Sequence, residues 1–108
     1  MFPVTVSSGL IVHENRILIG KKQEGYHPAD LGGKWVLPGG RVEIGESASD
    51  ALLREVIEET FLRVHIEEAM GEYTDIRSNG STRIFYFRCS PITVIAKPGD
   101  DLQTLLWW

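Results

Sequence analysis

Residues 47–60 are the segment of this 108-residue chain in which the sequence pattern predicts a long helix. No glycine or proline interrupts them, and Ser47 with Asp50 three positions later resembles a capping box at a helix start. Elsewhere, glycine, proline and polar residues divide the chain into short apolar runs typical of strands. We therefore expect an α+β fold, with many strands around one central helix, in a single domain spanning residues 1–108.

Nine runs are strand candidates: 4–12, 17–19, 35–37, 41–43, 64–66, 69–73, 82–89, 92–96 and 102–108. A tight hairpin turn is predicted at residues 13–16, where Asn15 tolerates a positive φ. Residues 23–34 are rich in glycine and are expected to form a surface loop, and Ser78-Asn79-Gly80-Ser81 predicts a further turn.

The predicted helix has an acidic side. At about 100° per residue, Glu55, Glu58 and Glu59 fall within one narrow sector. A broad sector on the opposite side, expected to pack on the sheet, holds Leu52, Leu53, Val56 and Ile57. Like charges at this spacing repel one another, so the cluster is explained if a cation lies between them. Oxygen ligands favour a hard cation, Mg²⁺ or Mn²⁺; a solvated acidic face is the alternative.

Glycines come directly before this helix. Pro38-Gly39-Gly40 and Gly45 would let the backbone approach the acidic side closely, so that a peptide carbonyl could join a metal shell. An ordinary tight turn also explains them. The two features together are more specific than either alone.

Composition narrows the function. The formal net charge is −4 without a basic patch, which argues against nucleic-acid or membrane-surface binding. Cys89 is the single cysteine, which excludes an internal disulfide and a zinc site built on paired cysteines. The N-terminal residues lack the pattern of a signal peptide, and a cytoplasmic location is the default expectation.

Residues 40–62, GRVEIGESASDALLREVIEETFL, closely resemble the Nudix box, G-x5-E-x7-R-E-U-x-E-E-x-G-U, in which U is a bulky aliphatic residue. The matching positions include Gly40, Glu46, Arg54, Glu55, Glu58 and Glu59. Residues 35–39 also resemble the family's lead-in, and the resemblance extends over most of the chain. It implies the Nudix fold, a mixed sheet packed around a catalytic helix in an α/β/α sandwich, here with the last helix missing.

Two departures from the family pattern stand out. Phe61 takes the place of a glycine that normally ends the helix in a left-handed conformation, which costs a residue with a Cβ about 1 kcal/mol. The helix is therefore expected to end differently, or the site to be looser. The sequence also stops at Trp107-Trp108, where family members usually continue through a further helix. Truncation, or burial by a partner subunit in a homodimer, would account for two terminal tryptophans.

The resemblance implies a Mg²⁺ (or Mn²⁺) site. Glu55, Glu58 and Glu59 would hold one or more ions, completed by the Gly40 carbonyl and Glu46. The ions would neutralise a diphosphate and activate water.

The resemblance also implies catalytic roles. Glu55 is the first candidate for the group that takes a proton from water, and Asp101 the second. Glu58 is expected to be essential for turnover. Helix geometry predicts that Arg54 points away from the acidic side, so orienting a glutamate is its expected role and contact with substrate the alternative.

Substrate choice is weakly encoded. Lys21, Lys22 and Arg41 are candidates to meet phosphates, Tyr26 to stack on a base, and Trp35 to form core or pocket wall. Solvated cations and structural aromatics are the alternatives. The resemblance favours a small nucleotide substrate, a nucleoside triphosphate cleaved to the monophosphate and pyrophosphate. ADP-ribose or a nucleotide-sugar is the alternative substrate, and a non-catalytic nucleotide-binding module the alternative function.

Overall fold

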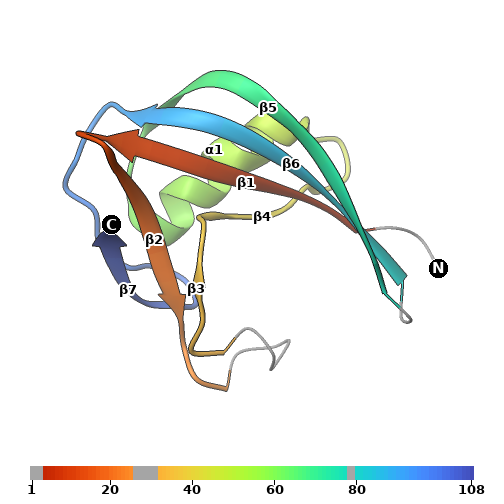
Figure 1. The fold of residues 1–108 in the computed structure, drawn as a ribbon, viewed down its shortest axis with the longest axis horizontal. Helices are drawn as coiled ribbons and strands as arrows, with labels where there is room; N and C mark the ends of the chain where they lie inside the picture. Colours follow the sequence, from red (N-terminus) through yellow and green to blue (C-terminus); the bar gives the residue numbers. More distant parts are fainter. Residues whose placement is uncertain (1–3, 26–31, 78–79) are drawn as a thin grey trace.

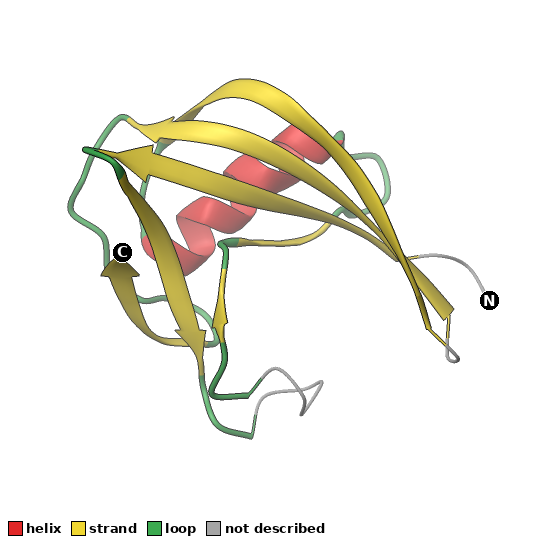
Figure 2. Ribbon diagram, viewed as in Figure 1, coloured by secondary structure: helices red, strands yellow, loops and turns green. Residues whose placement is uncertain are grey.

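The computed structural model describes residues 4–25, 32–77 and 80–108. Its elements in chain order are β1 (Val4–His13), β2 (Arg16–Lys22), β3 (Trp35–Val36), β4 (Gly39–Arg41), α1 (Ala48–Thr60), β5 (Val64–Arg77), β6 (Gly80–Pro91) and β7 (Leu102–Trp107). The strands form one sheet in the order β3-β2-β1-β6-β5, with β4 also paired to β1 and β7 to β2. The helix crosses one side of this curved sheet (Figures 1 and 2), which confirms the α+β prediction. In the described ranges, α1 is the only helix, and none is long and apolar enough to span a membrane.

Strand β1 organises the sheet. Along most of its length it pairs in parallel with β6, whereas the other strand pairs of the sheet are antiparallel. The opposite edge of β1 pairs with β4 in its first half and with β2 at its end, through the predicted hairpin. Glu14 and Asn15 in that turn have φ of 49° and 61°, the pair of positive values that a two-residue type I′ turn requires. By holding β4, β1 places Gly39 and Gly40 beside α1.

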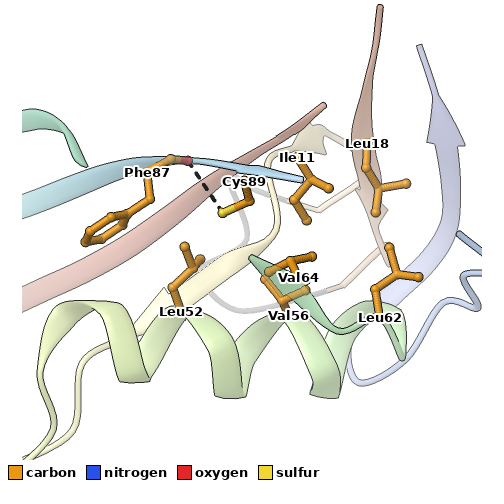
Figure 3. Close-up of a cluster of buried hydrophobic side chains, with 8 residues drawn as sticks. All are labelled: Ile11, Leu18, Leu52, Val56, Leu62, Val64, Phe87 and Cys89. Atoms are coloured by element: carbon orange, nitrogen blue, oxygen red, sulfur yellow. Dashed lines mark hydrogen bonds between the residues drawn. The ribbon is translucent and has the colours of Figure 1, made fainter. Parts of the chain in front are cut away.

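The core lies between α1 and the sheet (Figure 3). Its fully or nearly fully buried side chains are Ile11, Leu18, Leu52, Val56, Leu62, Val64, Phe87 and Cys89. Leu52, Val56 and Thr60 repeat every four residues and form the stripe of the helix that packs inward. Ile57 lies beside this stripe and is 44% exposed, so the prediction that it packs on the sheet is wrong. The apolar face is narrower than the sequence suggested.

Three strand predictions need correction. Residues 41–43 were expected to form a strand, but β4 is Gly39–Arg41, because pairing with Ser7 and Ser8 of β1 recruits the two glycines. Residues 64–66 and 69–73 belong to one long strand, β5, whose register shifts accommodate the break. Residues 92–96 form no strand; they begin the β6–β7 connection (residues 92–101), which runs to the end of α1.

The helix ends in the left-handed conformation that a glycine adopts easily, although the residue there is Phe61, which carries a side chain. Phe61 has φ 61° and ψ 14°, and its N–H donates to the Ile57 carbonyl at 2.9 Å. The expectation that the helix ends differently is therefore wrong. The β6–β7 connection satisfies two further carbonyls of the last turn: the N–H groups of Lys97 and Gly99 donate to Thr60 and Glu59 at 3.0 and 2.8 Å. The cost of the left-handed residue is thus offset by contacts from another part of the chain.

We expect Phe61→Gly to be more stable than Phe61→Ala by about 1 kcal/mol, because both lose the ring but only alanine keeps a Cβ in the left-handed region. Urea unfolding of the two variants, followed by circular dichroism, measures the difference. Equal stability would show that position 61 carries no backbone strain.

Candidate active site

The three glutamates of α1 differ sharply in burial. The side chain of Glu58 is 47% exposed, that of Glu55 is 14% exposed and that of Glu59 only 3%. The acidic side of the helix therefore runs from solvent down to the sheet. Burial without a partner would be costly for each inner carboxylate, so their contacts decide what the site can do.

Glu55 lies directly against the backbone of β4. A Cβ on Gly40 would be 2.4 Å from the carboxyl carbon of Glu55, so a larger residue here would displace this carboxylate. Nη1 of Arg54 donates to Oε1 of Glu55 at 2.9 Å. Burial raises the pKa of Glu55, and the hydrogen bond from Arg54 opposes that shift. Gly40 is thus beside the acidic side, as the sequence predicted.

Arg54 joins the turn before the helix to the acidic side. Its Nε and Nη2 donate to the two oxygens of Glu46 at 2.8 and 2.9 Å, and Nη2 also donates to the Arg41 carbonyl at 3.0 Å. The hydrogen bonds from Arg54 lower the pKa of Glu46 to about 2, and Glu46 in turn raises the pKa of the guanidinium. The prediction that Arg54 points away is wrong, since it reaches Glu55 and, at 3.4 Å, Glu58. Its contacts suit orientation of glutamates.

This geometry does not favour Glu46 as a metal ligand. Both of its oxygens face Arg54, and one also accepts from the backbone N–H of Glu43 at 2.9 Å. It belongs to neither of the carboxylate groups that the described residues bring together. Its place in a metal shell stays a prediction.

Glu59 is the buried member of the set. Its Oε1 accepts from the Gly39 N–H at 2.8 Å, and Nζ of Lys22 lies 3.6 Å from Oε2. Burial raises the pKa of Glu59 to about 7, although the Gly39 hydrogen bond and Lys22 act in the opposite direction. A divalent cation bound beside Glu59 would displace this proton, because its positive charge favours the carboxylate form.

The β6–β7 connection brings two aspartates to the helix. A Cβ on Gly99 would be 2.3 Å from the Glu58 carbonyl oxygen, so only glycine lets this segment approach so closely. Asp100 follows with φ 52° and lies in two groups whose carboxylate oxygens are within 4.8 Å of one another. These groups are Glu55, Glu58 and Asp100, and Glu59, Asp100 and Asp101. We call the five residues together the acidic cluster.

Asp100 is a member of the acidic cluster that the sequence did not predict. Of the two aspartates that follow Gly99, only Asp101 was predicted to have a role in the chemistry. The signal in the sequence is the pair of aspartates directly after Gly99. This signal does not show that the segment approaches α1.

Lys22 and Asp101 form a buried ion pair. Nζ of Lys22 lies 2.7 Å from Oδ2 of Asp101, and the lysine is 8% exposed. Oδ1 of Asp101 is buried and has no hydrogen-bond partner among the described residues. An unsatisfied buried carboxylate oxygen within a group of acidic side chains fits a hard divalent cation, which takes oxygen ligands.

The other substrate candidates that the structure describes do not belong to this cluster. Lys21 and Trp35 are cross-strand partners, and Lys21 is on the opposite face of β2 from Lys22. Trp35 is 46% exposed, so of its two predicted places, core or pocket wall, the core is wrong. Arg41 is exposed at the end of β4, and Tyr26 lies outside the described residues. Their contact with substrate stays a prediction.

The NUDIX domain family matches residues 1–108, the whole chain. The chain belongs to the Nudix family. A solved Nudix hydrolase from Nitrosomonas europaea superposes with a TM-score of 0.85 at 25% identity, covering 100% of this chain and 58% of that one.

Two curated Nudix-related proteins are similar in sequence. A putative 8-oxo-dGTP diphosphatase 2 from Mycobacterium tuberculosis is 38% identical over 85 residues, 77% of this chain and 57% of the relative. An ADP-ribose pyrophosphatase from Methanocaldococcus jannaschii is 32% identical over 105 residues, 95% of this chain and 60% of the relative. The chain thus spans less than two thirds of the length of these relatives.

Glu59 should make the stability of this Nudix domain depend on pH. Its folded-state pKa of about 7 lies above the ordinary value of 4.5, so the folded protein keeps a proton that the unfolded chain releases. In metal-free buffer, stability should therefore fall as pH rises from 4.5 to 7, by at most about 3 kcal/mol. Thermal unfolding across this range measures the slope.

Glu59→Gln is the control for that slope. The amide keeps an acceptor for the Gly39 N–H but cannot titrate, so the decline should flatten. An unchanged slope in this variant would assign the pH dependence to other groups.

Proposed function

We propose that this Nudix domain hydrolyses a phosphoanhydride bond in a nucleoside triphosphate or a related nucleotide, using Mg²⁺ or Mn²⁺ and releasing the monophosphate and pyrophosphate. The observation that carries the proposal is the convergence of five carboxylates from α1 and the β6–β7 connection beside the β4 backbone. Repulsion between so many acidic groups is relieved by a divalent cation bound among them.

The cluster supplies ligands of the type that Mg²⁺ prefers. Glu55, Glu58 and Asp100 would hold a cation on the solvent side, and Glu59 with Asp101 would do so on the buried side. When bound, the ion supplies positive charge that neutralises the phosphates and polarises the attacked phosphorus. Glu58, whose side chain is 47% exposed, is the helix glutamate most accessible to a nucleotide arriving from solvent.

Glu55 is the residue we assign to take the proton from the attacking water. It is close to the β4 backbone, is largely shielded from solvent, and has a raised pKa, which suits a general base. Arg54 holds its Oε1 and thereby orients the second oxygen. Asp101, the other candidate, is engaged by Lys22 through Oδ2, so we assign it to the cation.

The preferred substrate is a nucleoside triphosphate, including oxidised forms. Similarity to a protein described as a putative 8-oxo-dGTP diphosphatase supports this choice. The similarity to an ADP-ribose pyrophosphatase favours ADP-ribose or another nucleotide-sugar as the alternative substrate.

Hydrolysis is tested with dNTPs, 8-oxo-dGTP and ADP-ribose in the presence of Mg²⁺, with phosphate products followed by chromatography. We expect Glu58→Gln to lower kcat by at least about 100-fold, because the amide removes a charged ligand of a cation that would supply several kcal/mol of charge stabilisation. Removal of divalent ions with EDTA should abolish turnover, and added Mg²⁺ should restore it.

The matched control is Glu14→Gln, an exposed glutamate in the β1–β2 turn outside the cluster, which should keep full activity. Saturable nucleotide binding without any product would contradict the proposed hydrolysis and show that the domain is a nucleotide-binding module. Turnover of ADP-ribose alone would overturn the substrate choice and keep the reaction type.

A further inference from the structure

Lys22 is an unusual lysine because it is buried. Its side chain is 10% exposed, and desolvating an ammonium group is costly unless anions surround it. Nζ lies 2.7 Å from Oδ2 of Asp101 and 3.6 Å from Oε2 of Glu59. With two carboxylates this close and little access to solvent, Lys22 is poorly placed to receive a substrate phosphate.

The backbone around Lys22 is fixed as firmly as its side chain. Its N–H donates to the Lys34 carbonyl and its carbonyl accepts from the Gly33 N–H, both at 2.9 Å. The next N–H, of Gln23, donates to the carbonyl of Asp101 at 3.0 Å. Asp101 is therefore held to the end of β2 through both its backbone and its side chain.

The two oxygens of Asp101 are in different situations. Oδ2 contacts Lys22, whereas Oδ1 is buried without a hydrogen-bond partner among the described residues. Asp101 also shares a carboxylate group with Glu59 and Asp100, so one contact from Lys22 fixes the orientation of a side chain whose second oxygen remains available.

We propose that Lys22 is a positioning residue of the acidic cluster: it holds Oδ2 of Asp101 so that Oδ1 is presented to a divalent cation shared with Glu59 and Asp100. This inference rests on the proposed function, because it concerns how the cation site of that reaction is organised. Lys22 acts through Asp101 and touches neither the cation nor the substrate.

The test is Mn²⁺ binding without nucleotide, measured by calorimetry on the intact chain and on Lys22→Met, Asp101→Asn and the double variant. Each single substitution should weaken Mn²⁺ binding about 10-fold, the lower end of the effect of losing a partner of a metal ligand. The double variant should bind no more weakly than Asp101→Asn, since the proposed effect of Lys22 on the cation is exerted through Asp101. Lys97→Met, an exposed lysine on the same connection, is the matched control and should leave binding unchanged.

Additive losses in the double variant would overturn the inference, and so would unchanged or tighter Mn²⁺ binding by Lys22→Met. If Lys22→Met does not fold, because it leaves two buried carboxylates without their cation, Asp101→Asn and the double variant carry the test. Equal affinities of that pair support the positioning role, and a 10-fold difference between them overturns it. Absence of Mn²⁺ uptake by the unsubstituted chain would instead remove the metal site itself, and the proposed function with it.

Discussion

Burial of acidic side chains beside the C-terminal half of α1 is the constraint on which the rest of the structure depends. The negative end of the helix dipole lies there, and the last turn carries no basic residue to offset these charges. Compensation comes from an earlier turn of the helix and from the sheet: Arg54 reaches forward along α1, Lys22 extends from β2, and the Gly39 N–H donates from β4. The order of the strands can be understood as the arrangement that delivers these groups.

Close approach of backbone to carboxylate is the second requirement. A Cβ at Gly40 would overlap Glu55, and one at Gly99 would overlap the carbonyl of Glu58, so glycine on two separate segments lets the cluster close. In both cases a backbone segment lies where a side chain would otherwise hold the acidic groups apart. The glycines therefore contribute to the site by their lack of volume as much as by their conformational freedom.

The sequence predicted those features of the fold that depend on residues close together in the chain. The Ser47 cap and the lack of glycine and proline defined the helix, and the apolar runs between glycine, proline and polar residues located β1 and β6. Pairing between distant segments could not be obtained in this way. Lys22 is neutralised because β2 and β7 meet at a register shift beside it, and Asp100 reaches the cluster because residues 92–96, although strand-like in composition, lead to the helix instead of the sheet. A helical projection also missed that a long arginine can extend around its own helix.

The end of α1 and the acidic cluster are held in place by the same segment, the β6–β7 connection. The same N–H groups of the β6–β7 connection that satisfy the carbonyls of Thr60 and Glu59 fix the position of Asp100, which follows one residue later. The ring of Phe61 lies close to this connection, since a Cβ on Gly99 would be 3.0 Å from it. Replacing the family's glycine at position 61 thus adds a side chain at the point where the connection docks, while Gly99 supplies the space that the docking needs. The backbone strain at Phe61 is therefore linked to the placement of Asp100 in the acidic cluster. Substitutions at this junction should change the stability and the metal affinity of the domain together.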